Sequence, residues 1–105
     1  MSGYAQGDIV VLEHPLFDEH IIGRIAAPPT KSTVVIEYWN RRSGGWSDDP
    51  RRRKATSIVG RLAGDVTLTA ERLQSATGEL AASLKRARAS YVRTVHALVE
   101  QAPRP

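Results

Sequence analysis

Residues 33–39 read TVVIEYW and form the clearest β-strand pattern in this chain of 105 residues. β-Branched and aromatic side chains suit a pleated, half-buried surface, and successive side chains of a strand point to opposite faces. One face therefore takes Val34, Ile36 and Tyr38, and the other takes Val35, Glu37 and Trp39. The charge of Glu37 indicates that the second face is the wetter one.

Two stretches before residue 33 also have strand character. Residues 9–12 read IVVL, and Gly7-Asp8 opens this strand. Residues 20–27 read HIIGRIAA, and Pro28-Pro29 ends this second strand because proline has no N–H to donate. Three strands are therefore expected in the first 40 residues.

The stretch at residues 46–62 is ambiguous. The run TSIV at 56–59 is β-prone and favours a strand over roughly residues 52–58. Against that, Asp49-Pro50 resembles a helix cap followed by proline at the first helical position, and the apolar residues that follow keep helical spacing. A strand and a short helix both stay open.

Four segments of this half resemble strands of SH3-like small barrels of the Tudor and KOW kind. They are GDIVV at 7–11, IGRI at 22–25, VVIEYW at 34–39 and SIVGRL at 57–62. The match is one of pattern over residues 4–63 and contains no diagnostic motif. The resemblance implies a small β-barrel that binds a ligand, and members of this class bind RNA, DNA, proline-rich peptides or methylated side chains.

The chain after Gly64 has a different character. Residues 65–102 contain no proline, and the spacing of their apolar residues predicts one long helix. The apolar seam of this helix follows alternating steps of four and three residues, which is the heptad pattern of a coiled coil. The seam consists of Leu73, Thr77, Leu80, Leu84, Ala87, Tyr91, Thr94 and Leu98.

This seam has two interpretations. We expect it to pair with a second copy of the chain and form a homodimer, with contacts from Leu73, Leu80, Leu84, Tyr91 and Leu98. In the alternative, the helix folds back onto the wetter face of the barrel, where Ile22, Val35 and Trp39 would otherwise be exposed. The expected fold class is therefore α+β, with an SH3-like small β-barrel at residues 1–63 and one long C-terminal α-helix within residues 64–105.

The formal net charge of the chain is +4, and its distribution is uneven. Residues 1–50 carry four basic and seven acidic side chains. Residues 51–64 carry five basic and no acidic ones, and residues 65–105 carry six basic and four acidic ones. Positive potential at the junction and along the helix favours a polyanionic partner.

The amino-acid composition also restricts the expected cellular location of the protein. The chain has no cysteine, which excludes disulfides and thiolate metal sites and is typical of a reducing compartment. No signal peptide is visible, and no apolar run approaches the ~20 residues of a membrane-spanning helix. We therefore expect a soluble, cytoplasmic protein without a membrane partner.

The main candidate site combines basic and aromatic residues around the junction. Guanidinium groups bind phosphates, and aromatic faces stack on bases. The predicted nucleic-acid contacts are Arg41, Arg42, Trp46, Arg51, Arg52, Arg53 and Lys54, with Trp39 as a further stacking residue and with Arg86 and Arg93 extending the basic track along the helix. The alternative is a solvated loop, with both tryptophans packed against the barrel.

Other chemistry has less support in the sequence. Candidates for a cage around a methylated cation are Tyr4, Phe17, Tyr38, Trp39 and Trp46, although core packing explains the same rings. The cluster of His14, Asp18, Glu19 and His20 has no spacing typical of a metal site. The sequence has no nucleophile elbow, no phosphate-cradling glycine loop and no acid–base pair, so we expect neither an enzyme nor a cofactor.

These features predict a small nucleic-acid-binding protein. Its barrel and basic loop would contact the phosphate backbone of DNA or RNA, and its helix would mediate dimerisation. The alternative is a protein–protein adaptor or assembly subunit that docks or oligomerises through its long helix. That alternative predicts no nucleic-acid affinity beyond that of any basic protein.

Overall fold

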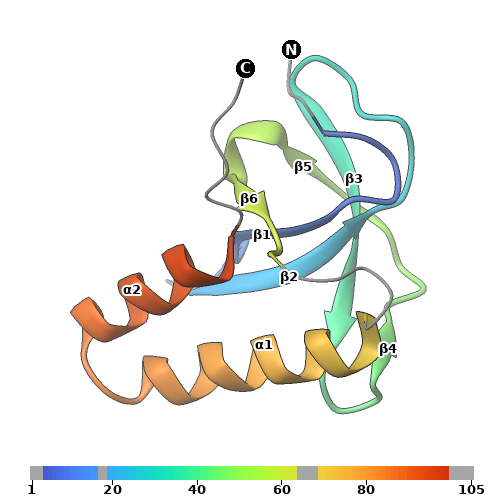
Figure 1. The fold of residues 1–105 in the computed structure, drawn as a ribbon. Coiled ribbons are helices and arrows are strands. Elements are labelled where there is room, and N and C mark those ends of the chain that lie inside the picture. The colour runs from blue at the N-terminus through green and yellow to red at the C-terminus, as the bar shows by residue number, and fades with distance from the viewer. Residues whose placement is uncertain (1–3, 17–18, 64–68, 100–105) are drawn as a thin grey trace.

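A computed structural model of the chain describes residues 4–16, 19–63 and 69–99 (Figure 1). In this part of the chain the strands are β1 (Ile9–Glu13), β2 (His20–Ile25), β3 (Thr33–Asn40), β4 (Gly45–Trp46), β5 (Arg51–Lys54) and β6 (Ile58–Arg61). A 3-10 turn, η1 (Ala55–Ser57), joins β5 to β6, and two helices follow, α1 (Thr69–Leu84) and α2 (Arg88–Leu98). The α+β class expected from the sequence is confirmed.

The strands form one antiparallel sheet in the order β4-β3-β2-β1-β6, and β5 pairs with β3. β5 pairs with residues 33–36 of β3 and β4 with residues 39–40, so these two short strands follow each other along the edge of β3 that faces away from β2. β6 lies at the other end of the sheet, beside β1. No pairing joins β5 to β6 among the described residues, so the sheet is not closed.

The stretch at residues 46–62, which the sequence leaves ambiguous, is mostly strand. The expected strand at 52–58 corresponds to β5, but it ends at Lys54, and η1 follows it. The reason is local, because the Ser57 hydroxyl donates a hydrogen bond of 2.6 Å to the Lys54 carbonyl oxygen. Such a side-chain bond to nearby backbone favours a turn over continued strand pairing.

Alternation along the strands gives the sheet two apolar faces, each with its own hydrophobic cluster. The inner cluster contains the buried residues Val10, Leu12, Ile25, Val34 and Ile36. The outer cluster joins the sheet to the helices and contains Val11, Ile22, Trp39, Leu73, Ala76, Leu80, Tyr91, Val95, Leu98 and Val99. The two faces expected for β3 are confirmed, because Val34 and Ile36 lie in the inner cluster and Trp39 lies in the outer one.

The C-terminal segment forms two helices, so the prediction of one long helix is wrong. A straight helix from residue 69 to residue 98 would be about 45 Å long at 1.5 Å per residue. The folded molecule extends at most 36 Å, so the end of such a helix would project into water. The chain instead turns after Leu84, and α2 returns beside α1, which buries Tyr91, Val95 and Leu98 (Figure 1). No glycine or proline occurs at residues 85–87, so packing imposes this turn without a local helix breaker.

The apolar seam of the helices lies against the sheet within one chain. Leu73, Leu80, Tyr91 and Leu98 are buried in the outer cluster, whereas Leu84 at the end of α1 is 42% exposed. The structure therefore has the fold-back arrangement, in which the helices cover part of the wetter face of the sheet. Homodimerisation through the seam stays a prediction, but four of its five expected contact residues are already buried within the chain.

The end of α2 is also joined to the last strand. Val99 forms an isolated β-bridge with Leu62, and the Ala63 N–H donates a hydrogen bond of 2.7 Å to the Leu98 carbonyl oxygen. A Cβ atom at Gly60 would lie 3.2 Å from the Cβ of Val99, so glycine permits this close approach. The strand-rich and helical segments thus share a backbone contact as well as a hydrophobic cluster.

Candidate nucleic-acid interface

The basic run of the junction forms strand β5, and its side chains are divided between the two faces of the sheet. Arg53 lies opposite Val34, which belongs to the inner cluster. Directly opposed residues of paired strands share a face, and side chains alternate along each strand. Arg51 and Arg53 therefore lie on the inner face, and Arg52 and Lys54 lie on the outer face.

Two of these four cations already have partners. The guanidinium of Arg53 donates hydrogen bonds to the Tyr38 hydroxyl at 2.9 Å and to the Glu13 carbonyl oxygen at 2.7 Å. Both acceptors are neutral, so Arg53 ties the end of β1 to β5 without losing its charge. Arg51 forms an exposed ion pair of 2.6 Å with Asp49, a contact of a kind worth about 0–1 kcal/mol.

A polar hollow of about 430 Å³ opens at the edge of β5. It is lined by Glu13, His14, Pro15, Arg52, Arg53, Lys54, Thr56 and Ser57. Arg52 and Lys54 are exposed, and neither forms an ion pair with any other described residue. Basic side chains and hydroxyl groups thus line one concave, solvent-facing surface, which we call the β5 hollow.

The backbone of β5 adds hydrogen-bond donors along the same edge. The Ala55 N–H donates a hydrogen bond of 2.8 Å to the Ser32 carbonyl oxygen, across the boundary between the two strands. In an antiparallel pair, residues that bond to the neighbouring strand alternate with residues that do not. Arg53, two residues before Ala55, therefore bonds to β3, and the N–H groups of Arg52 and Lys54 face the open edge.

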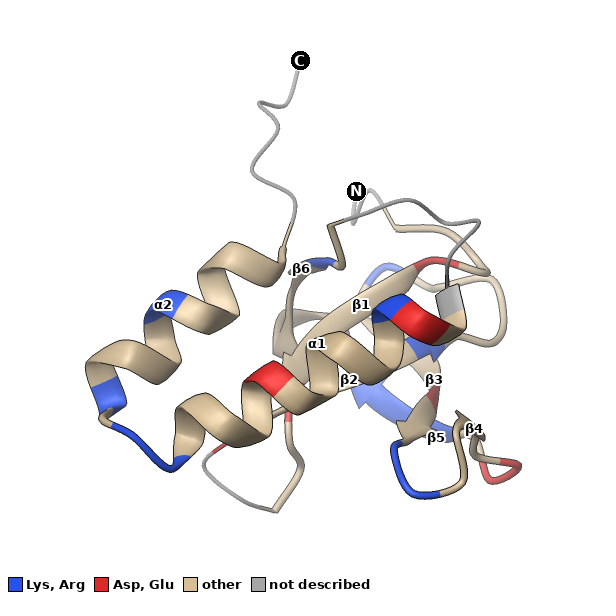
Figure 2. Ribbon diagram, turned by 60° about the horizontal axis from the view of Figure 1, so that its bottom comes forward, with Lys and Arg blue, Asp and Glu red and all other residues tan. Residues whose placement is uncertain are grey.

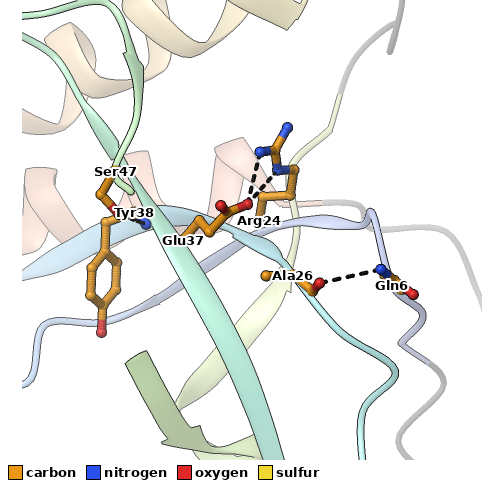
Figure 3. A network of polar contacts seen from close by, with 6 residues as sticks. All are labelled: Gln6, Arg24, Ala26, Glu37, Tyr38 and Ser47. Carbon is orange, nitrogen blue, oxygen red and sulfur yellow. Dashed lines mark hydrogen bonds and ion pairs between the residues drawn. The ribbon is translucent and has the colours of Figure 1, made fainter. Parts of the chain in front are cut away.

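The two tryptophans lie on the outer face, packed against other residues of the sheet and α1. Trp39 is buried, and its indole N–H donates a hydrogen bond of 2.9 Å to Gln74 Oε1. Trp46 packs edge-on against Trp39 with 5.1 Å between ring centroids, and the Arg24 guanidinium lies 4.7 Å from the Trp46 ring centroid. Arg24 is itself paired with Glu37 at 2.7 Å (Figure 3). A base would have to displace Arg24 to stack on that face of Trp46.

The other predicted contact residues lie away from the β5 hollow. Arg41 and Arg42 are exposed in the loop between β3 and β4, where Gln74 donates a hydrogen bond of 3.2 Å to the Arg41 carbonyl oxygen. Arg86 lies in the connection between α1 and α2, and Arg93 is exposed on α2. Figure 2 shows basic residues at this connection and at the β3–β4 loop in different parts of the molecule. The structure thus spreads the predicted residues over separate surfaces.

Four polar residues of the β5 hollow were not predicted from the sequence as partners of the basic run. Thr56 and Ser57 follow that run almost directly, and hydroxyl groups beside Arg and Lys were a signal that the sequence contained. Glu13 and His14 come from the end of β1 and the loop after it, and Glu13 precedes Arg53 by 40 residues. Only the pairing of the strands brings these two residues beside β5.

A second hollow, of about 300 Å³, lies where α1, α2 and the start of β2 meet. Most of its lining is apolar and includes Ile21, Leu80 and Leu84, with Glu19 and Lys85 among the lining residues. The Tyr91 hydroxyl, also in the lining, accepts a hydrogen bond of 2.5 Å from the backbone N–H of His20. This surface suits an apolar ligand or segment better than a polyanion.

Other kinds of site find less support in the part of the chain that the structure describes. Tyr4 and Tyr38 pack beside the inner cluster while Trp39 and Trp46 belong to the outer face, so these rings form no common cage, and Phe17 lies outside the described residues. No group of three His, Cys, Asp or Glu side chains could hold a metal ion there, and Asp18 is not described. No described helix is long and apolar enough to cross a membrane.

Comparison with known proteins finds no matching family model, curated protein or solved structure.

Proposed function

We propose that the protein binds nucleic acid through the phosphate backbone, with the β5 hollow as the contact surface. The observation that carries this proposal is the exposure of Arg52 and Lys54 in that hollow without an ion-pair partner among the described residues. Such cations release condensed counterions when they neutralise phosphates, and this release provides most of the affinity in non-specific binding. The net charge of +4 adds a favourable long-range attraction.

The contact that this geometry supports is largely independent of base sequence. Phosphate contacts position a protein on nucleic acid but carry no direct sequence information. Stacking on bases needs accessible aromatic faces, and here Trp39 is buried while Arg24 lies over Trp46. We therefore expect similar affinities for strands of different base sequence.

The strand order supports a finer assignment of the fold, as a small SH3-like barrel. The order β6-β1-β2-β3-β5, with a 3-10 turn between β5 and β6, agrees with the pattern by which residues 4–63 resemble that class. Because one fold serves many functions, this assignment adds less weight than the charges of the β5 hollow. The absence of cysteine is compatible with the cytoplasm, where nucleic acids are abundant.

The proposal is tested by fluorescence anisotropy with labelled duplex DNA, single-stranded DNA and RNA of equal length over a salt series. The test variant is R52A/K54A, and the matched control is K85A/R88A, which removes two exposed positive charges, one from the connection between the helices and one from the start of α2. We expect the test variant to bind about tenfold more weakly, with a salt slope reduced by about 1–2, because each phosphate contact contributes about one unit of slope. The control should lose less than about threefold in affinity.

Two results would contradict the proposal. Equal weakening of the two double variants would mean that binding follows total charge and not the β5 hollow. Wild-type binding that is weak, equal for all three nucleic acids and absent at physiological salt would mean that the protein is not a nucleic-acid binder.

A second candidate function, a protein–protein adaptor, is favoured by the apolar hollow beside the helices. Leu84 lines that hollow and is 42% exposed, which leaves apolar surface for a segment of a partner protein. This function predicts that L84D loses a protein partner and keeps any nucleic-acid affinity. It also predicts that R52A/K54A keeps the partner.

A further inference from the structure

The β5 hollow has more positive charge than one internal phosphate of a nucleic acid neutralises. Arg52, Arg53 and Lys54 line it together with one carboxylate, Glu13. The two hydrogen bonds of Arg53 go to neutral oxygens, so its charge also counts toward the hollow. An internal phosphodiester has a single negative charge, whereas a phosphomonoester carries about −1.5 to −2 at pH 7. Three cations and one carboxylate therefore match a phosphomonoester better.

The groups along this edge are mostly hydrogen-bond donors. Neither the guanidinium of Arg52 nor the ammonium of Lys54 forms an ion pair with another described residue. The hydroxyl of Thr56 lies on the same lining, and the backbone N–H groups of Arg52 and Lys54 face the open edge of β5. A terminal phosphate presents three strong acceptor oxygens and so satisfies more of these donors than a diester does.

The boundary of the β5 hollow also favours the end of a nucleic-acid strand over its interior. The segment at residues 13–15 forms one side and η1 with Lys54 forms another, and the volume of about 430 Å³ is within the range of pockets that hold small molecules. A nucleic-acid strand that continued past Glu13 would bring its next phosphate toward the Glu13 carboxylate, and like charges repel. A carboxylate is instead a good acceptor for a sugar hydroxyl of a terminal nucleotide.

From these three features we infer that the β5 hollow binds the terminal phosphomonoester of a nucleic-acid strand. The inference rests on the proposed function and names the part of the nucleic acid that the hollow binds. Arg52, Lys54 and Thr56 contact the phosphate oxygens, and Glu13 faces the terminal sugar. Arg53 is a positioning residue as well as a source of charge, because its hydrogen bonds hold the end of β1 beside β5.

The test uses single-stranded oligonucleotides of one sequence with an internal fluorophore and with a 5′-phosphate, a 3′-phosphate or only hydroxyl groups at their ends. Anisotropy is measured at physiological salt with the full chain. We expect one of the two phosphorylated forms to bind about tenfold more tightly than the hydroxyl form, which is the effect of one additional charge-assisted contact. R52A/K54A should lose this preference, K85A/R88A should keep it, and T56V should reduce it.

The outcomes separate this inference from the proposed function. Equal affinity for phosphorylated and hydroxyl ends, together with weakened binding by R52A/K54A, overturns the terminal-phosphate inference and leaves the proposed function standing. Absence of oligonucleotide binding overturns both. A neutral peptide with one phosphoserine that displaces the phosphorylated oligonucleotide as efficiently as 5′-AMP does would mean that the hollow recognises a phosphomonoester on any carrier, which overturns its assignment to nucleic-acid ends.

Discussion

The inner and outer clusters differ in how they are assembled from the chain. The residues of the inner cluster lie between Val10 and Ile36, on three consecutive antiparallel strands. The outer cluster joins Val11 and Ile22 to residues of both helices and to Val99, which follows α2. The candidate site lies at the edge of β5, where Arg53, on the inner face, lies opposite Val34 and bonds to Tyr38, which packs beside the inner cluster. The helices thus stabilise the sheet from its outer face, whereas one cation of the site, Arg53, is held on the inner face.

Removal of the two helices should have the largest effect on the sheet. A chain of residues 1–63 would expose Val11, Ile22 and Trp39, and we expect it to lose cooperative folding because a domain of about 60 residues is marginal even with its core intact. Circular dichroism melting and the dispersion of amide proton shifts would measure this. A cooperative melt with dispersed shifts would instead show that the inner cluster is sufficient alone.

A single substitution in the outer cluster gives a smaller effect in the same direction. Leu73 is buried between α1 and the sheet, so L73A should lower the free energy of unfolding by about 2–5 kcal/mol. The matched control is L84A, on the same helix but 42% exposed, which should cost less than about 1 kcal/mol. Urea denaturation measures both. Similar losses for the two variants would contradict the packing described for α1.

The inner cluster can be disturbed without touching the helices. A Cβ atom at Gly23 would collide with the Ile36 side chain, so G23A should cost about 1–3 kcal/mol through overpacking. At Gly45 an added Cβ meets no atom within 4 Å, which makes G45A the control. Urea midpoints of the two variants test this difference. Equal stability of G23A and G45A would mean that the inner cluster can accommodate an added methyl group at residue 23.

The inner cluster could be predicted from the sequence more completely than the outer one. The strands of the inner cluster follow a period of two and are bounded by glycine and proline, so residues 33–39 and their two faces are predictable. The turn after Leu84 is not, because no glycine or proline marks residues 85–87 and the burial of Tyr91, Val95 and Leu98 by α2 depends on the fold. The heptad seam was a correct sign of burial, but spacing alone does not identify the surface that covers it.

The candidate site could also be predicted from the sequence only in part. The basic run at residues 51–54 is visible in the sequence, whereas the contribution of Glu13 and His14 depends on strand pairing across 40 residues. The stacking role expected for Trp46 took no account of Arg24, which lies over its ring because β2 and β3 are neighbours. Local composition therefore predicts charge, and only the fold determines which charges have partners.

A polar contact between α2 and β2 should have a moderate effect on the free energy of unfolding. The Tyr91 hydroxyl accepts a hydrogen bond from the His20 backbone N–H and lies 2.9 Å from His20 Nδ1, which connects α2 to β2. Y91F removes this acceptor and leaves the ring in place, so we expect a loss of about 1 kcal/mol. Urea denaturation measures the loss, and hydrogen exchange at the His20 amide should quicken. An unchanged exchange rate would mean that this amide has another acceptor.

The smallest expected effect is at the proposed contact residues themselves. Arg52 and Lys54 are exposed on an edge strand and form no ion pair among the described residues, so R52A/K54A should change the free energy of unfolding by less than about 0.5 kcal/mol. R53A, between them in sequence but on the other face, loses two hydrogen bonds and should cost about 1 kcal/mol. A clear destabilisation of R52A/K54A would show that these cations support the fold. If its stability is unchanged, a loss of nucleic-acid affinity in this variant must arise from the missing contacts.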